Sequence, residues 1–80
     1  MLVNRKEVRK LKVIANKYDE KHIMKMLREG TGLKQEEFGK SIGISGMTIQ
    51  GYERGTRNYT FKTLMDIAKK HGYTITIEKK

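Results

Sequence analysis

Residues 35–52 read QEEFGKSIGISGMTIQGY, and this stretch predicts two short helices joined by a tight turn. Apolar side chains recur at helical spacing around the turn, at Phe38, Ile42, Ile44, Ile49 and Tyr52. Gly43 suits the left-handed backbone that ends the first helix, and Ser45 is placed to cap the second. Gly39 has almost no side chain, so we expect the second helix to cross the first at close range there.

The composition limits the class of protein. The chain has 80 residues, 18 Lys and Arg against 9 Asp and Glu, a formal net charge of +9 and no cysteine. This length suits one small domain with a modest core, which dimerisation would support. Neither disulfides nor thiolate metal sites are available, and two isolated histidines form no ligand cluster. We expect no cofactor and no bound metal.

The sequence predicts no membrane attachment. No apolar run approaches the roughly 20 residues that cross a bilayer, and the opening segment MLVNRKEVRK does not resemble a signal peptide. We therefore expect a cytoplasmic protein. The positive charge favours a polyanionic partner, of which DNA is the densest, although an anionic membrane surface or an acidic protein would explain the charge equally well.

Residues 1–18 form a basic extension. Apolar residues recur at helical spacing over 4–17, which favours a helix. The LKVIA segment at 11–15 is also a plausible strand, because Val13 and Ile14 are β-branched. We favour the helix.

Residues 19–72 form the predicted helical domain. Outside the central pair we expect a helix over 20–29 with Asp19 as its cap, and a helix over 61–71 capped by Thr60. Their apolar faces contain Ile23, Met24 and Leu27 in the first and Phe61, Leu64, Met65 and Ala68 in the second.

Residues 73–80 change to the alternation of a β-strand, with apolar Tyr73, Ile75 and Ile77 between polar residues. A lone strand needs a partner. The candidates are the same strand of a second subunit, the LKVIA segment and a partner protein. We take Tyr73, Ile75 and Ile77 as candidate dimerisation residues.

The stretch LREGTGLKQEEFGKSIGISGMTIQGYERGTRN, residues 27–58, resembles the helix-turn-helix domain of the Xre and lambda-repressor/Cro superfamily. The resemblance covers about residues 23–72. It implies a mainly α, lambda-repressor-like helix-turn-helix bundle that binds double-stranded DNA, here with an N-terminal extension and a C-terminal β-strand. We expect no enzyme, because no nucleophile-and-base set, carboxylate pair in a pocket or phosphate-binding glycine motif is present.

The resemblance also implies which residues meet DNA. The first residue of the first central helix contacts the DNA backbone, and early residues of the second helix touch base edges in the major groove. By position, the DNA-binding residues are Gln35, Ser45, Gly46, Met47, Thr48, Gln50 and Gly51, with Arg54, Arg57 and Asn58 in the following loop. Two of the reading positions are glycines, and Met47 offers only apolar contacts. Thr48 and Gln50 are therefore the hydrogen-bonding candidates.

Other positions are implied to support this surface. Arg28 and Glu53 match an ion pair in many relatives, and Gly39 and Gly43 match the helix-turn-helix glycines. Lys34, Lys40 and Lys62 are further candidates for phosphate contacts.

The predicted function is sequence-specific transcription regulation, by a repressor that binds a near-palindromic operator as a homodimer. One alternative is an antitoxin that inhibits a toxin and also represses its own operon. Another is a protein-interaction module on the same fold. The two glycines on the reading face favour this last alternative.

Overall fold

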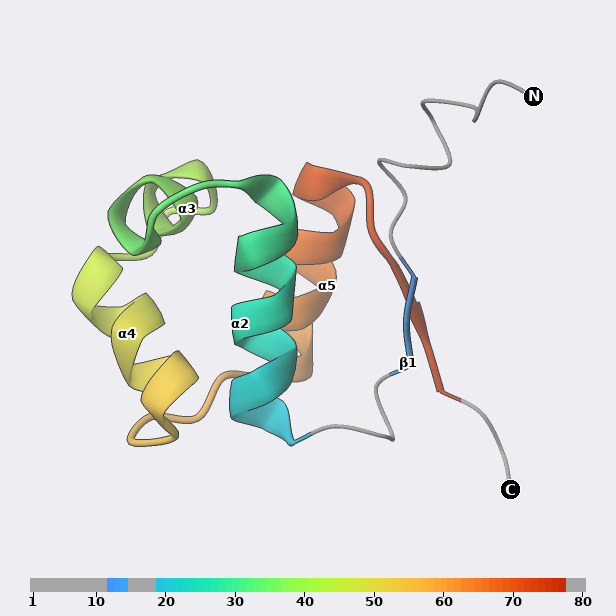
Figure 1. Ribbon diagram of the computed structural model, residues 1–80, viewed down its shortest axis with the longest axis horizontal. Coiled ribbons are helices and arrows are strands. Elements are labelled where there is room, and N and C mark those ends of the chain that lie inside the picture. The colour runs from blue at the N-terminus through green and yellow to red at the C-terminus, as the bar shows by residue number, and fades with distance from the viewer. Residues whose placement is uncertain (1–11, 15–18, 78–80) are drawn as a thin grey trace.

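The computed structural model describes residues 12–14 and 19–77, where four helices lie between two short strands. In chain order the elements are β1 (Lys12–Ile14), α2 (Glu20–Thr31), α3 (Gln35–Ser41), α4 (Gly46–Arg54), α5 (Phe61–His71) and β2 (Thr74–Thr76). In Figure 1, α3 and α4 lie on one side of α2, and the two strands lie on the other side, next to α5. The expected helical bundle with a C-terminal strand is confirmed.

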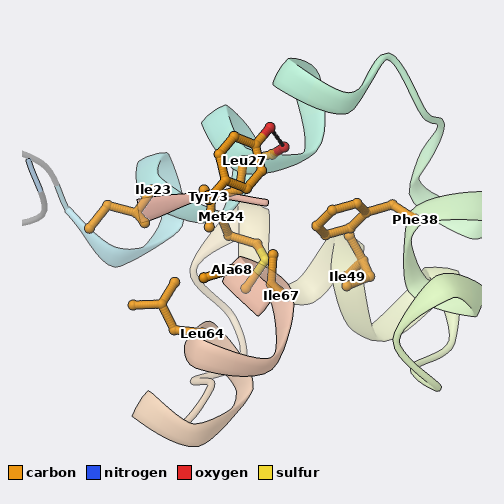
Figure 2. Close-up of a cluster of buried hydrophobic side chains, with 9 residues drawn as sticks. All are labelled: Ile23, Met24, Leu27, Phe38, Ile49, Leu64, Ile67, Ala68 and Tyr73. Carbon is orange, nitrogen blue, oxygen red and sulfur yellow. Dashed lines mark hydrogen bonds between the residues drawn. The ribbon is translucent and has the colours of Figure 1, made fainter. Parts of the chain in front are cut away.

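The core lies where the four helices meet. Its nine buried residues are Ile23, Met24, Leu27, Phe38, Ile49, Leu64, Ile67, Ala68 and Tyr73. Figure 2 shows Phe38 and Ile49 together at one end of this cluster, with Ile23 and Leu64 toward the other. Burying one side chain of this size contributes about 1.5–3 kcal/mol. The core therefore joins the predicted reading helix, through Ile49, to the rest of the domain.

The outer helices follow the prediction, except that α2 ends at Thr31 rather than at residue 29 and that two side chains differ from it. Asp19 occupies the N-cap position of α2, but its side chain makes no capping hydrogen bond. In α5, Thr60 caps as expected, with its hydroxyl 3.1 Å from the amide nitrogen of Thr63. Phe61, however, is 63% exposed, and Ile67 is fully buried instead. The reason is that the core meets α5 only after its first residues, so its first apolar side chain lies outside.

The N-terminal extension contains a strand where we favoured a helix. Lys12–Ile14 form β1, so the helix prediction for 4–17 is wrong at these positions and the LKVIA strand is correct. The remainder of that predicted helix lies outside the described residues. β1 runs parallel to β2, with Val13 opposite Ile75. The strand is stabilised by a hydrogen-bonding partner at the other end of the chain, which local periodicity cannot reveal.

The C-terminal strand pairs within the same chain, and this changes the role of Tyr73. Its side chain is 9% exposed, and its hydroxyl donates to the Leu27 carbonyl at 2.6 Å (Figure 2). Ile75 is partly buried against the core, whereas Ile77 is 66% exposed. Tyr73 is therefore a core residue rather than a candidate dimer contact. Among the three candidates, Ile77 retains the most open surface.

Candidate nucleic-acid interface

The turn between α3 and α4 depends on two glycines, as predicted. A Cβ atom at Gly39 would overlap the carbonyl oxygen of Ile44 and lie 3.1 Å from Cγ1 of Ile49. Gly43 has a φ of +74°, which L side chains rarely adopt. The amide of Ile44 then donates to the Gly39 carbonyl at 2.8 Å. The closest approach at Gly39 is therefore to the turn, and α4 is its second neighbour.

Ser45 begins α4 as an N-cap. Its hydroxyl oxygen accepts from the amide of Thr48 at 3.1 Å, which confirms the predicted cap. The two hydroxyl oxygens lie 2.8 Å apart and also form a hydrogen bond. Each hydroxyl has one proton and two lone pairs, so Thr48 retains some hydrogen-bonding capacity for an outside partner. Part of that capacity already serves the cap.

Gly46 brings the first turn of α4 against the first turn of α3. A Cβ at this position would lie 2.9 Å from Cα and 3.2 Å from Cβ of Glu36. Glycine is thus required for the packing of the two helices, which accounts for its presence at a reading position. Next to this contact is an open hollow lined by Gln35, Glu36, Ser45, Gly46, Met47 and Gln50. Glu36 was not among the predicted site residues, because its position at a helix start already accounted for it.

The outward face of α4 carries the remaining reading candidates. Met47 is 82% exposed, the highest value among the large apolar side chains described as exposed. Gln50 is partly exposed and Arg54 is exposed. Met47, Gln50 and Arg54 stand at i, i+3 and i+7, which places them on one side of the helix. The sequence and the structure agree that this side is open.

Arg28 and Glu53 form the predicted ion pair, which holds α4 in place. Nε of Arg28 lies 2.7 Å from Oε2 of Glu53, and Nη2 lies 3.0 Å from Oε1. Nη1 donates to the Leu33 carbonyl at 3.0 Å, and Nε2 of Gln35 lies 3.4 Å from Oε1 of Glu53. The hydrogen bonds to Glu53 raise the pKa of the Arg28 guanidinium above its ordinary value. Gln35 thus contacts α4 directly, through Glu53.

The helical scaffold matches a known protein family. Residues 24–77 match the family model of a helix-turn-helix family, the Cro/C1-type or Xre-like family. The chain belongs to this helix-turn-helix family. No significant match was found among curated proteins or among solved structures. Family membership supports a DNA-binding regulatory protein.

In this helix-turn-helix protein, the loop after α4 is tied down at both ends. Gly55 has a φ of +80° and ends the helix, and the Gly51 carbonyl accepts the amides of Thr56 and Arg57 at 3.0 and 3.2 Å. At the far end, the Tyr59 hydroxyl donates to the Glu20 carbonyl at 2.5 Å. Burial raises the pKa of Tyr59 to about 12. These hydrogen bonds fix the loop backbone that carries the exposed residues.

The basic side chains of this helix-turn-helix domain are mostly open. Arg54, Arg57, Lys34 and Lys40 are exposed, and so is Asn58 of the loop. Lys62 is also exposed, but its ammonium lies 2.9 Å from Oδ2 of Asp66 four residues later. Such an exposed pair is worth little, so it competes weakly with a phosphate. The exposed positive charge thus lies around α3, at the end of α4, in the following loop and at the start of α5.

The C-terminal end of α3 carries a contact that the sequence did not predict. His71 of α5 stacks on the ring of Phe38 with 5.2 Å between ring centroids, and its Nε2 lies 2.9 Å from Oγ of Ser41. Ser41 donates its own proton to the Phe38 carbonyl at 2.6 Å, so Nε2 of His71 carries the shared proton. Burial, followed by the charge of Lys70, lowers the pKa of His71. This contact joins α3 to α5, so the role of His71 is structural.

Within the described residues, no three side chains of His, Asp or Glu come together as metal ligands. None of the helices in that part of the chain is both long and apolar enough to span a bilayer.

Proposed function

We propose that the protein is a sequence-specific DNA-binding repressor that places α4 in the major groove and excludes the transcription machinery. The observation that carries this proposal is the outward face of α4, where Met47, Gln50 and Arg54 are open on a helix held by a cap and an ion pair. Binding and steric exclusion are sufficient for repression, so no chemical step is needed.

The side chains suggest a particular division of the reading. Gln50 can hydrogen-bond the edge of an adenine, and Met47 can contact a thymine methyl group. Thr48 has a smaller part, since its hydroxyl also serves the cap. Because few side chains read bases, shape and deformability of the DNA add to the specificity. Arg54, Arg57 and the exposed lysines bind phosphates and set the register.

We further propose that two copies bind together on a near-palindromic operator, with their α4 helices about 34 Å apart. Within the described residues the sheet has two strands, so each strand has one partner and an outer edge. Ile77, the residue directly after β2, is exposed. Pairing of two such edges would join two copies. The mass of the free protein and of its DNA complex, measured by light scattering, tests this proposal.

Selection of bound sites from random double-stranded DNA tests the main proposal. We expect a short, near-palindromic consensus, and an affinity that falls steeply with salt because several cations displace counterions. A weak dependence on salt, combined with equal binding to the consensus and to random competitor, would contradict it.

An antitoxin is the second candidate, and the position of the strands favours it. β1 and β2 lie on the side of the domain opposite α3 and α4 (Figure 1), so a toxin could bind there while α4 holds DNA. Co-purification with the product of a neighbouring gene would distinguish an antitoxin from a plain repressor. The interaction-module alternative loses its support, because packing against Glu36 and Arg57 accounts for the two glycines.

A further inference from the structure

Gly51 is buried although it lies on the outward face of α4. It stands four residues after Met47 and three before Arg54, and both of these side chains are exposed. Residues at this spacing share one side of a helix. Gly51 is nevertheless buried, so another part of the chain must cover it.

The cover is the aliphatic stem of Arg57. A Cβ atom at Gly51 would lie 2.9 Å from Cδ, 3.0 Å from Cγ and 3.3 Å from Cβ of Arg57. These distances are shorter than ordinary van der Waals contact, so the stem rests on the bare backbone of the helix. Any larger residue at position 51 would displace it.

The backbone of the loop is attached at the same point. The Gly51 carbonyl accepts the amides of Thr56 and Arg57 at 3.0 and 3.2 Å, and also the Thr56 hydroxyl at 3.3 Å. Arg57 is thus held twice by one residue, through its main chain and through its stem. A side chain held in this way loses less conformational entropy when it binds.

The charged end of Arg57 has no described acidic partner. Among residues 19–77, the close contacts between acidic and basic side chains are Asp19–His22, Arg28–Glu53 and Lys62–Asp66. Arg57 is exposed. Within residues 19–77, no carboxylate therefore neutralises this guanidinium beside the reading face.

We propose that Gly51 is a positioning residue, which allows Arg57 to take the place of a side chain at position 51 and to hold one DNA phosphate. This inference rests on the proposed DNA-binding function. A phosphate is favoured over a base because Arg57 belongs to the loop after α4 and not to the helix that enters the groove. The guanidinium fork also matches phosphate geometry.

The first test uses the free protein. Nuclear Overhauser contacts between the α-protons of Gly51 and the methylene protons of Arg57 are expected in the wild type. Gly51→Ala should remove the close packing and leave the melting temperature equal or higher, because alanine favours a helix over glycine. Absence of these contacts in the wild type would overturn the proposal without affecting the proposed function.

The second test measures affinity against salt for two short duplexes, one with the selected site and one of mixed sequence. Arg57→Ala should weaken binding to both by about tenfold and reduce the slope of log affinity against log salt by about 0.9. Gly51→Ala should cause part of the same loss, whereas Arg57→Lys should keep the slope.

The double variant Gly51→Ala/Arg57→Ala should bind no worse than Arg57→Ala alone, because both changes remove one contact. Arg54→Ala is the matched control, and its effect should add to that of Gly51→Ala. The proposal is overturned if Gly51→Ala leaves affinity and slope unchanged, or if the two losses add. It is also overturned if Arg57→Ala alters base preference at an unchanged slope. A wild type without salt-dependent DNA binding would instead contradict the proposed function itself.

Discussion

The guanidinium of Arg28 donates two hydrogen bonds to the carboxylate of Glu53, at 2.7 and 3.0 Å, although the two residues are 25 positions apart in the sequence. The Glu53 side chain is 5% exposed and that of Arg28 is 17% exposed. Because Arg28 also donates to the Leu33 carbonyl, this one side chain connects α2, the turn before α3 and the end of α4. The orientation of the proposed reading helix therefore depends on a contact outside that helix.

Glu53→Ala should lower the free energy of unfolding by about 2–3 kcal/mol, because it leaves a largely buried guanidinium without its partner. Glu36→Ala is the matched control. Glu36 is exposed, so its loss should cost less than about 1 kcal/mol, mainly from the helix dipole. Thermal unfolding of both variants measures the difference, and equal losses would show that the ion pair contributes nothing special.

Gly39→Ala should destabilise the domain by about 1–3 kcal/mol, because the new methyl group would overlap the Ile44 carbonyl in the turn. Gly30 also lies within a helix, α2, but is exposed. Gly30→Ala should stabilise by about 1 kcal/mol, the difference in helix propensity. Chemical denaturation of the two variants should thus give changes of opposite sign. Two stabilising changes would contradict the close approach at Gly39.

Met47→Ala should weaken binding to the selected site by about 1 kcal/mol, roughly fivefold, through loss of an apolar contact with a thymine methyl. Binding to random DNA should hardly change. Met47 is 82% exposed, so stability should change by less than about 0.5 kcal/mol. Met26→Ala on α2 is the control and should leave both affinities as they were. Fluorescence anisotropy with the two duplexes measures the ratio, and an equal loss on both would remove Met47 from base reading.

His71 should make stability depend on pH. Its pKa is lowered in the fold by burial and by Lys70, so the unfolded chain binds the proton more readily. The stabilising contribution is therefore complete above the unfolded pKa of about 6.5. It is lost as the pH falls through the lower folded value.

The melting temperature of the wild type should fall as the pH drops below about 6.5, and His71→Gln should reduce that fall. The control is His22→Gln. The His22 side chain is 58% exposed, so this variant should keep the wild-type slope. Melting curves at closely spaced pH values measure the effect. Identical slopes for the wild type and His71→Gln would contradict the role of His71.

The elements with strong local signals could be predicted from the sequence. Ser45 and Thr60 cap the helices that they were expected to cap, and Gly43 adopts its left-handed turn. These features depend on side-chain chemistry within a few residues. The Arg28–Glu53 pair came from family resemblance, since its partners are far apart in sequence.

Features that depend on tertiary partners could not be predicted in the same way. The strand at Lys12–Ile14 exists because β2 lies beside it. Tyr73 lies in the core, where its hydroxyl donates to the Leu27 carbonyl of α2. From the sequence, Gly46 and Gly51 are glycines at positions where a side chain is expected to contact bases. Their purpose becomes clear only when Glu36 and Arg57 are seen against them. A close contact between distant residues leaves no periodic signal in a single sequence.

The parallel pairing of β1 with β2 also has a kinetic consequence. Val13 and Ile75 are partners in register, so their contact closes a loop of about sixty residues, whereas most helical contacts close short ones. Closing a long loop costs more chain entropy than closing a short one, and non-local pairings slow folding. We therefore expect the four helices to assemble first and the two strands to join last. Changes confined to the strands should accelerate unfolding while leaving the folding rate of the helical domain nearly unchanged.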